Sequence, residues 1–124
     1  MFINYKDYDL PIQSVELNEF NDVLLLKTSS YTYKYEAFGD CCSVSRFETY
    51  LNNDFSSIIG KIIKSVKEIN SYAIENFNND NYDAVTPHLF EIKFKNSNDT
   101  FKFLMVNYSN GYYDGWISSY VVII

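Results

Sequence analysis

The sequence is poor in the residues that most often build catalytic, phosphate-binding and metal sites. Its 124 residues include only two cysteines, one histidine, four glycines and two prolines. There is no glycine-rich phosphate loop, and no nucleophile-elbow, zinc-protease or calcium-loop pattern. We therefore expect no cofactor and no metal ion, and the sequence favours a protein that is not an enzyme.

Positive charge is also scarce. Ten Lys and Arg residues stand against sixteen Asp and Glu residues, which gives a net charge of −6, and the basic residues are scattered. Because phosphate-binding surfaces need clustered Lys and Arg, nucleic acid and anionic membrane are not expected partners. No apolar run approaches the roughly 18 residues of a membrane span. The first ten residues are polar and acidic, so no signal peptide is expected.

Aromatic residues are abundant, at 19% of the chain. They suit half-buried pleated surfaces, and several of them alternate with polar residues at the period of a strand. Tyr31, Tyr33 and Tyr35 form one such stripe, for which a place in the core is favoured. The alternation and the turn signals predict strands over 12–17, 23–28, 31–37, 61–69, 90–95, 101–105 and 116–123.

Two hairpins and a loop are predicted in the second half of the chain. A short turn at 97–99 joins two strands. Asn110-Gly111 is a type I′ turn signal, after which the strand over 116–123 is expected to pair back on its predecessor. The Asn- and Asp-rich residues 75–86 predict a mobile surface loop.

One short helix is predicted as well. Ser45 and Glu48 have the spacing of a capping box, which predicts a helix from Arg46 to Leu51. A further turn over 55–59 would stop at Gly60. The predicted fold is therefore a single α+β domain over residues 1–124, a mostly antiparallel twisted sheet of six to seven strands with one short helix.

The sharpest local motif is Asp40-Cys41-Cys42-Ser43. A cysteine here could act as a nucleophile if His88 lowered its pKa, or the motif and His88 could bind a metal. Neighbouring residues of an extended chain point in opposite directions, however, and the Cys-x-x-Cys spacing of metal sites is missing. The favoured interpretation is structural, with one cysteine in the core.

The second candidate site is the aromatic group Tyr112, Tyr113 and Trp116, which follows the Asn110-Gly111 turn. Tyr and Trp are frequent at binding hot spots but are equally ordinary in a core, and both interpretations stay open. The apolar residues 121–124 either complete the sheet or dock on a partner.

Together, Gly39-Asp40-Cys41-Cys42-Ser43 and Ser109-Asn110-Gly111-Tyr112-Tyr113 resemble the motifs of a family of small uncharacterised domains. That family is common in bacteriophages and is also found in large DNA viruses and bacteria. The resemblance covers nearly the whole chain, brings no known activity with it, and implies a viral accessory protein. We thus predict a non-enzymatic protein-binding or structural module that acts in the host cytoplasm or the virion and binds another protein or itself. The alternative is a small cysteine-dependent enzyme or metal-binding protein centred on Cys41 and Cys42.

Overall fold

A computed structural model describes residues 3–40, 43–51, 53–70, 84–109 and 114–123. Within these residues, two short 3₁₀ helices and eight strands follow one another. In chain order they are η1 (Tyr5–Asp7), β1 (Ser14–Leu17), β2 (Val23–Lys27), β3 (Tyr31–Gly39), β4 (Val44–Thr49), η2 (Phe55–Ile58), β5 (Ile63–Asn70), β6 (Ala84–Phe94), β7 (Thr100–Ser109) and β8 (Gly115–Ile123).

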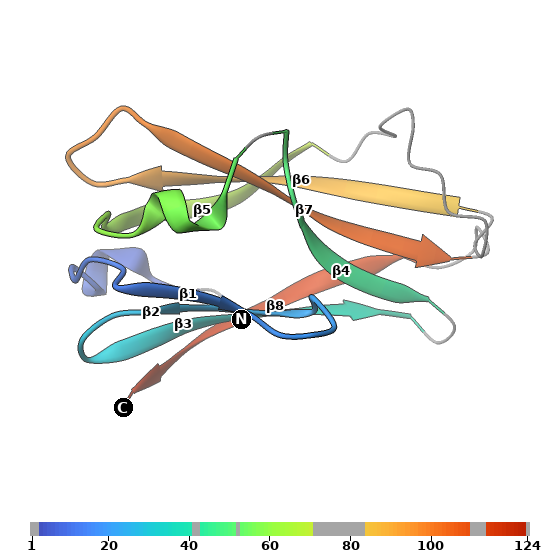
Figure 1. The fold of residues 1–124 in the computed structure, drawn as a ribbon, viewed down its shortest axis with the longest axis horizontal. Coiled ribbons are helices and arrows are strands. Elements are labelled where there is room, and N and C mark those ends of the chain that lie inside the picture. Colours follow the sequence, from blue (N-terminus) through green and yellow to red (C-terminus); the bar gives the residue numbers. More distant parts are fainter. Residues whose placement is uncertain (1–2, 41–42, 52, 71–83, 110–113, 124) are drawn as a thin grey trace.

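The strands form two four-stranded sheets that face each other as the two layers of a β-sandwich (Figure 1). The first sheet has the order β1-β2-β3-β8 and the second the order β4-β7-β6-β5, and every pairing is antiparallel. The prediction of an α+β fold with one sheet of six to seven strands is therefore wrong. The described residues contain no α-helix, and the strands divide equally between two sheets.

The predicted helix over Arg46–Leu51 is replaced by strand β4. Ser45 and Phe47 are buried while Arg46 between them is exposed, which is the alternation of a strand. The backbone of β4 pairs with β7, with Phe47 opposite Met105. The spacing from Ser45 to Glu48 fits a helix cap and a strand equally well, and the presence of β7 as a partner decides between them.

The predicted return of the last strand onto its predecessor is also wrong. β8 pairs with β3 of the other sheet, with Trp116 opposite Phe38. The reason is that both edges of β7 are already occupied, one by β4 and the other by β6. The Asn110-Gly111 turn itself lies outside the described residues.

The other predicted strands are confirmed, as is the turn at 97–99, where the Asp99 N–H donates to Ser97 Oγ at 3.0 Å. The turn over 55–59 is confirmed as η2, which is followed by Gly60 at a φ of 91°. Of the loop predicted over 75–86, residues 75–83 lie outside the described part of the chain. Its last residues begin β6.

The core lies between the two sheets and is rich in aromatic side chains. The interpretation of Tyr31, Tyr33 and Tyr35 as core residues is confirmed, since all three are buried on the inner face of β3. We call these three residues the tyrosine stripe. Tyr8 and Tyr5 near the start of the chain pack on them edge-on or tilted, and the second sheet adds Phe47, Phe94 and Phe103 from its own inner face.

Candidate functional site

Among the described elements, the chain passes from one sheet to the other twice, between β3 and β4 and between β7 and β8. These two crossings meet. The Asp40 N–H donates to the Asp114 carbonyl at 3.0 Å, and the Asp40 carbonyl accepts the Ser43 N–H at 2.8 Å and the Ser43 hydroxyl at 2.7 Å. We call this place, built by Gly39, Asp40, Ser43, Asp114 and Gly115, the crossing corner. It contains the described residues of the first motif that the sequence singled out, together with Asp114 and Gly115, which directly follow the second motif.

The crossing corner is too crowded for any side chain at its two glycines. Gly39 and Gly115 are opposite each other in the β3–β8 register. A Cβ on Gly115 would lie 2.1 Å from Ser45 Oγ and 2.7 Å from the Phe38 carbonyl oxygen. A Cβ on Gly39 would lie 2.4 Å from Ser43 Oγ. The close approach of the two sheets therefore depends on both glycines.

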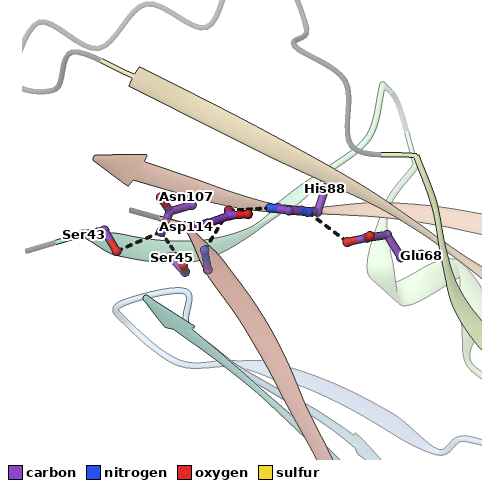
Figure 2. A network of polar contacts seen from close by, with 7 residues as sticks. Ser43, Ser45, Glu68, His88, Asn107 and Asp114 are labelled. Carbon is purple, nitrogen blue, oxygen red and sulfur yellow. Dashed lines mark hydrogen bonds and ion pairs between the residues drawn. The ribbon is translucent and has the colours of Figure 1, made fainter. Parts of the chain in front are cut away.

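The buried amide of Asn107 fills the space beside these glycines (Figure 2). Its Nδ2 donates to Ser43 Oγ and to Ser45 Oγ, each at 3.0 Å. Its Oδ1 is buried and has no hydrogen-bond partner within the described residues. Ser45, which the sequence suggested as a helix cap, is thus an acceptor in a polar cluster inside the sandwich.

His88 continues this polar network toward β5 (Figure 2). Its side chain is 9% exposed. Nδ1 lies 2.9 Å from Glu68 Oε1, and Nε2 lies 2.8 Å from Asp114 Oδ1, which also accepts the Gly115 N–H. A neutral imidazole has one N–H and can donate to one carboxylate, whereas the imidazolium donates to both. His88 thereby joins β5 and β6 of one sheet to the residue that precedes β8 of the other.

This arrangement bears on the proposed cysteine chemistry. A histidine that activates a thiol needs a ring nitrogen facing it, but both ring nitrogens of His88 face carboxylates. The two carboxylates lie at opposite sides of the ring rather than around one point. No group of three or more metal-ligating side chains occurs in the described ranges. Cys41 and Cys42 lie outside those ranges.

The predicted aromatic site is described only at Trp116, because Tyr112, Tyr113, Asn110 and Gly111 lie outside the described residues. Trp116 is 49% exposed and stacks on Phe38, with the ring centroids 5.9 Å apart and the planes at 23°. Phe38 is itself 40% exposed. We call these two residues the aromatic patch. Phe38 was not predicted as part of this site, although it continues the outward-facing side of the strand alternation from Lys34 and Glu36.

A cleft of about 670 Å³ opens between the sheets at the side where β5 and β8 lie. Its lining is largely apolar and includes Val66, Phe90 and Ile117. The hydroxyls of Tyr5 and Tyr35 hydrogen-bond at 2.8 Å in its wall. Burial raises the pKa of Tyr5 to about 12, so this pair is neutral at physiological pH and offers no acid–base group.

Comparison with known proteins finds a viral relative of this chain. No protein-family model and no solved structure matches the chain. The "Uncharacterized protein L278" of Acanthamoeba polyphaga mimivirus is 32% identical over 108 residues, which cover 86% of this chain and 83% of that protein. The chain belongs to the family of this mimivirus protein. The mimivirus protein family is thus viral and uncharacterised, and the expected link to a large DNA virus is confirmed. The presence of the two motifs across the family and the link to bacteriophages stay predictions.

The name of the mimivirus protein states no function. In the part of this chain that the structure describes, no helix has the length and apolar character needed to span a membrane.

Proposed function

We propose that this chain is a viral accessory protein that works by binding protein, as a non-enzymatic binding or structural module in the host cytoplasm or the virion. The observation that carries the proposal is the aromatic patch. Two large rings, Phe38 and Trp116, are stacked on each other on the outer face of a sheet yet remain about half exposed. Rigid, partly exposed aromatic side chains are typical anchors of protein interfaces.

The surroundings of the patch support this use. Trp116 lies on β8, which is the edge strand of its sheet, and Val122 and Ile123 on the same strand are 42% and 70% exposed. Val122 and Ile123 lie six and seven residues from Trp116 along β8, so apolar side chains are exposed at both ends of this edge strand, which favours an interaction site. The chemistry found at the other candidate site weighs against an enzyme, because neither nitrogen of His88 faces a nucleophile in the described residues.

The experiment is affinity capture of the tagged protein from the cells in which it is naturally made. Baits carrying Phe38→Ser or Trp116→Ser are compared with wild type and with Leu51→Ser. Leu51 is 79% exposed and lies in the connection after β4, so its variant is matched in removing exposed apolar surface. Circular dichroism of each purified bait shows that the fold is kept.

We expect a stoichiometric partner with wild type and Leu51→Ser, and its loss with both patch variants. A partner retained by both patch variants would assign binding to another surface. Failure of every bait to recover a partner would contradict the proposed function.

A further inference from the structure

The outer face of the first sheet shows how this protein holds a cation against an aromatic ring. The ammonium group of Lys34 lies 5.5 Å from the centroid of the Tyr120 ring, which is opposite it in the β3–β8 register. The same ammonium pairs with the Glu36 carboxylate at 3.1 Å, and that carboxylate accepts the Tyr120 hydroxyl at 2.8 Å. An aromatic ring and a carboxylate therefore hold this cation together, which is a cation–π contact supported by an ion pair.

The aromatic patch lies further along the same two strands and has the same two components. Phe38 and Trp116 supply the partly exposed rings. Asp40 follows Phe38 by two residues and is exposed, and its N–H donates to the Asp114 carbonyl at 3.0 Å. This bond continues the pairing of the two strands by one step, so the alternation of an extended chain makes Asp40 the next residue after Phe38 on this face. Asp114, beside it, uses one carboxylate oxygen for His88.

No lysine or arginine of the described residues contacts the aromatic patch. All ten Lys and Arg residues lie in the described ranges. None of them pairs with Asp40 or Asp114, or lies over a ring of the aromatic patch. Lys34 is four residues before Phe38, roughly 13 Å along the strand, and is held at Tyr120. The rings and the Asp40 carboxylate thus have no cation from the described chain.

The charge of the chain favours a cationic occupant of this surface. The net charge is −6, and the two basic residues in the strands of the first sheet, Lys27 and Lys34, are each paired with a glutamate. A nucleic acid would meet carboxylates here without the basic residues that bind phosphate. A basic protein segment would instead be attracted by the field of the chain. Arginine suits the site best, because its planar guanidinium stacks on aromatic faces and binds carboxylates through two N–H groups.

We propose that the aromatic patch and Asp40 bind a basic segment of another protein, with an arginine of that segment stacked on Trp116 and paired with the Asp40 carboxylate. The inference rests on the proposed protein-binding function and names the chemistry of the partner. The rings of the patch then take the part that Tyr120 takes for Lys34, and Asp40 takes the part of Glu36.

The test uses the full chain, in which Trp116 is the only tryptophan, so that its fluorescence reports directly on the patch. The probe is a synthetic oligoarginine peptide, which is compared with oligolysine and oligoglutamate peptides of the same length. We expect a saturable change of fluorescence with oligoarginine, weaker binding of oligolysine and no binding of oligoglutamate. Added salt should weaken the binding of oligoarginine, because it screens exposed charges.

Substitutions then locate the site. Asp40→Asn should raise the Kd for oligoarginine about threefold to fivefold, the effect of losing one exposed ion pair. The matched control is Asp99→Asn, which removes the same charge from an exposed carboxylate at the turn between β6 and β7 and should leave the Kd nearly unchanged. Phe38→Ser keeps Trp116 as the reporter and should raise the Kd about tenfold. Circular dichroism of each variant checks that the fold is kept.

Fluorescence that does not respond to oligoarginine overturns the inference, as does an equal affinity for oligolysine. An equal effect of Asp40→Asn and Asp99→Asn would show that only the net charge acts, and this also overturns it. The proposed function fails separately. A partner that is captured through the aromatic patch but has no basic segment refutes this inference alone, whereas capture of no partner by any bait refutes the proposed function.

Discussion

The crossing corner and the tyrosine stripe both place polar groups inside the sandwich, but they use them differently. Beside the crossing corner, the Asn107 amide donates hydrogen bonds to Ser43 and Ser45, and these bonds fix the orientation of all three side chains. The neighbouring glycines leave no room for a side chain of their own. In the tyrosine stripe, the rings provide buried area, and one of the three hydroxyls, that of Tyr33, has no partner among the described residues. Directional polar contacts specify how the two sheets meet, whereas aromatic area stabilises them with less geometric demand.

Alkaline pH should break the tyrosine stripe and with it the whole fold, which is the largest effect we expect. Burial raises the pKa of Tyr5 to about 12 and that of Tyr33 and Tyr35 above the ordinary value of 10. The folded chain keeps these protons where the unfolded chain releases them. The stabilisation is therefore complete below about pH 10 and is lost as the pH rises through the raised pKa values, at about 1.4 kcal/mol per pH unit for each tyrosine.

Denaturant unfolding at several pH values, followed by circular dichroism, measures this loss, and tyrosinate absorbance reports the titration. Tyr5→Phe should reduce the loss of unfolding free energy per pH unit by about 1.4 kcal/mol, the contribution of one tyrosine. Tyr108, whose pKa burial raises to about 12, packs in a separate cluster and would keep its own share. A slope that is unchanged in Tyr5→Phe would show that the Tyr5 hydroxyl, which hydrogen-bonds to Tyr35 of the stripe, does not contribute to the alkaline transition.

Gly115→Ala should be the most damaging single substitution at the crossing corner, at about 3 kcal/mol of the free energy of unfolding. The new Cβ meets the Phe38 carbonyl oxygen, a backbone atom that cannot rotate away. Gly39→Ala is the matched comparison and should cost less, because the nearest atom there is the rotatable Ser43 hydroxyl. Equal tolerance of alanine at both positions in urea titrations would mean that the sheets are not held at this distance.

Asn107→Leu should destabilise the protein by about 1 to 2 kcal/mol, because it removes the donor shared by two buried or half-buried serines. A double-mutant cycle with Ser45→Ala should give a coupling free energy above about 0.5 kcal/mol. Strict additivity of the two substitutions would indicate that the cluster is held by packing rather than by its hydrogen bonds.

Tyr33→Phe should have the smallest effect, between no change and a gain of about 1 kcal/mol, since it removes a buried hydroxyl that has no partner in the described structure. Tyr35→Phe removes the hydrogen bond to Tyr5 and should cost about 1 kcal/mol. Thermal unfolding of the two variants side by side measures the contrast, and a larger loss for Tyr33→Phe would reverse our account of the stripe.

The strands were predictable because their alternation is a local signal. Tyr31, Tyr33 and Tyr35 point to one face whatever else the chain does. The helix over Arg46–Leu51 was wrong because the spacing of Ser45 and Glu48 is compatible with two periods, and only the partner strand β7 separates them. Whether the strands form one sheet or two depends on which strand β8 pairs with, and no local sequence pattern indicates that its partner is β3 rather than β7.

The polar network was beyond prediction for the same reason. Glu68, His88 and Asp114 come from three separate segments, and nothing in their spacing brings them to one ring. The sequence did point to Asp40 and Ser43 as part of a distinctive motif, for which a structural role was favoured over chemistry. It did not predict that their contacts join the two crossings between the sheets.

The pairing of β3 with β8 has a consequence for how the protein is made. Tyr31 pairs with Ile123, which lies 92 residues further along the chain (123 − 31), and contacts of such sequence separation slow folding. On the ribosome, the tyrosine stripe is synthesised early, but one edge of β3 has no partner until residue 123 has emerged. The nascent chain therefore carries an open, aromatic strand edge for most of its synthesis, and chaperones that shield such edges should determine its yield.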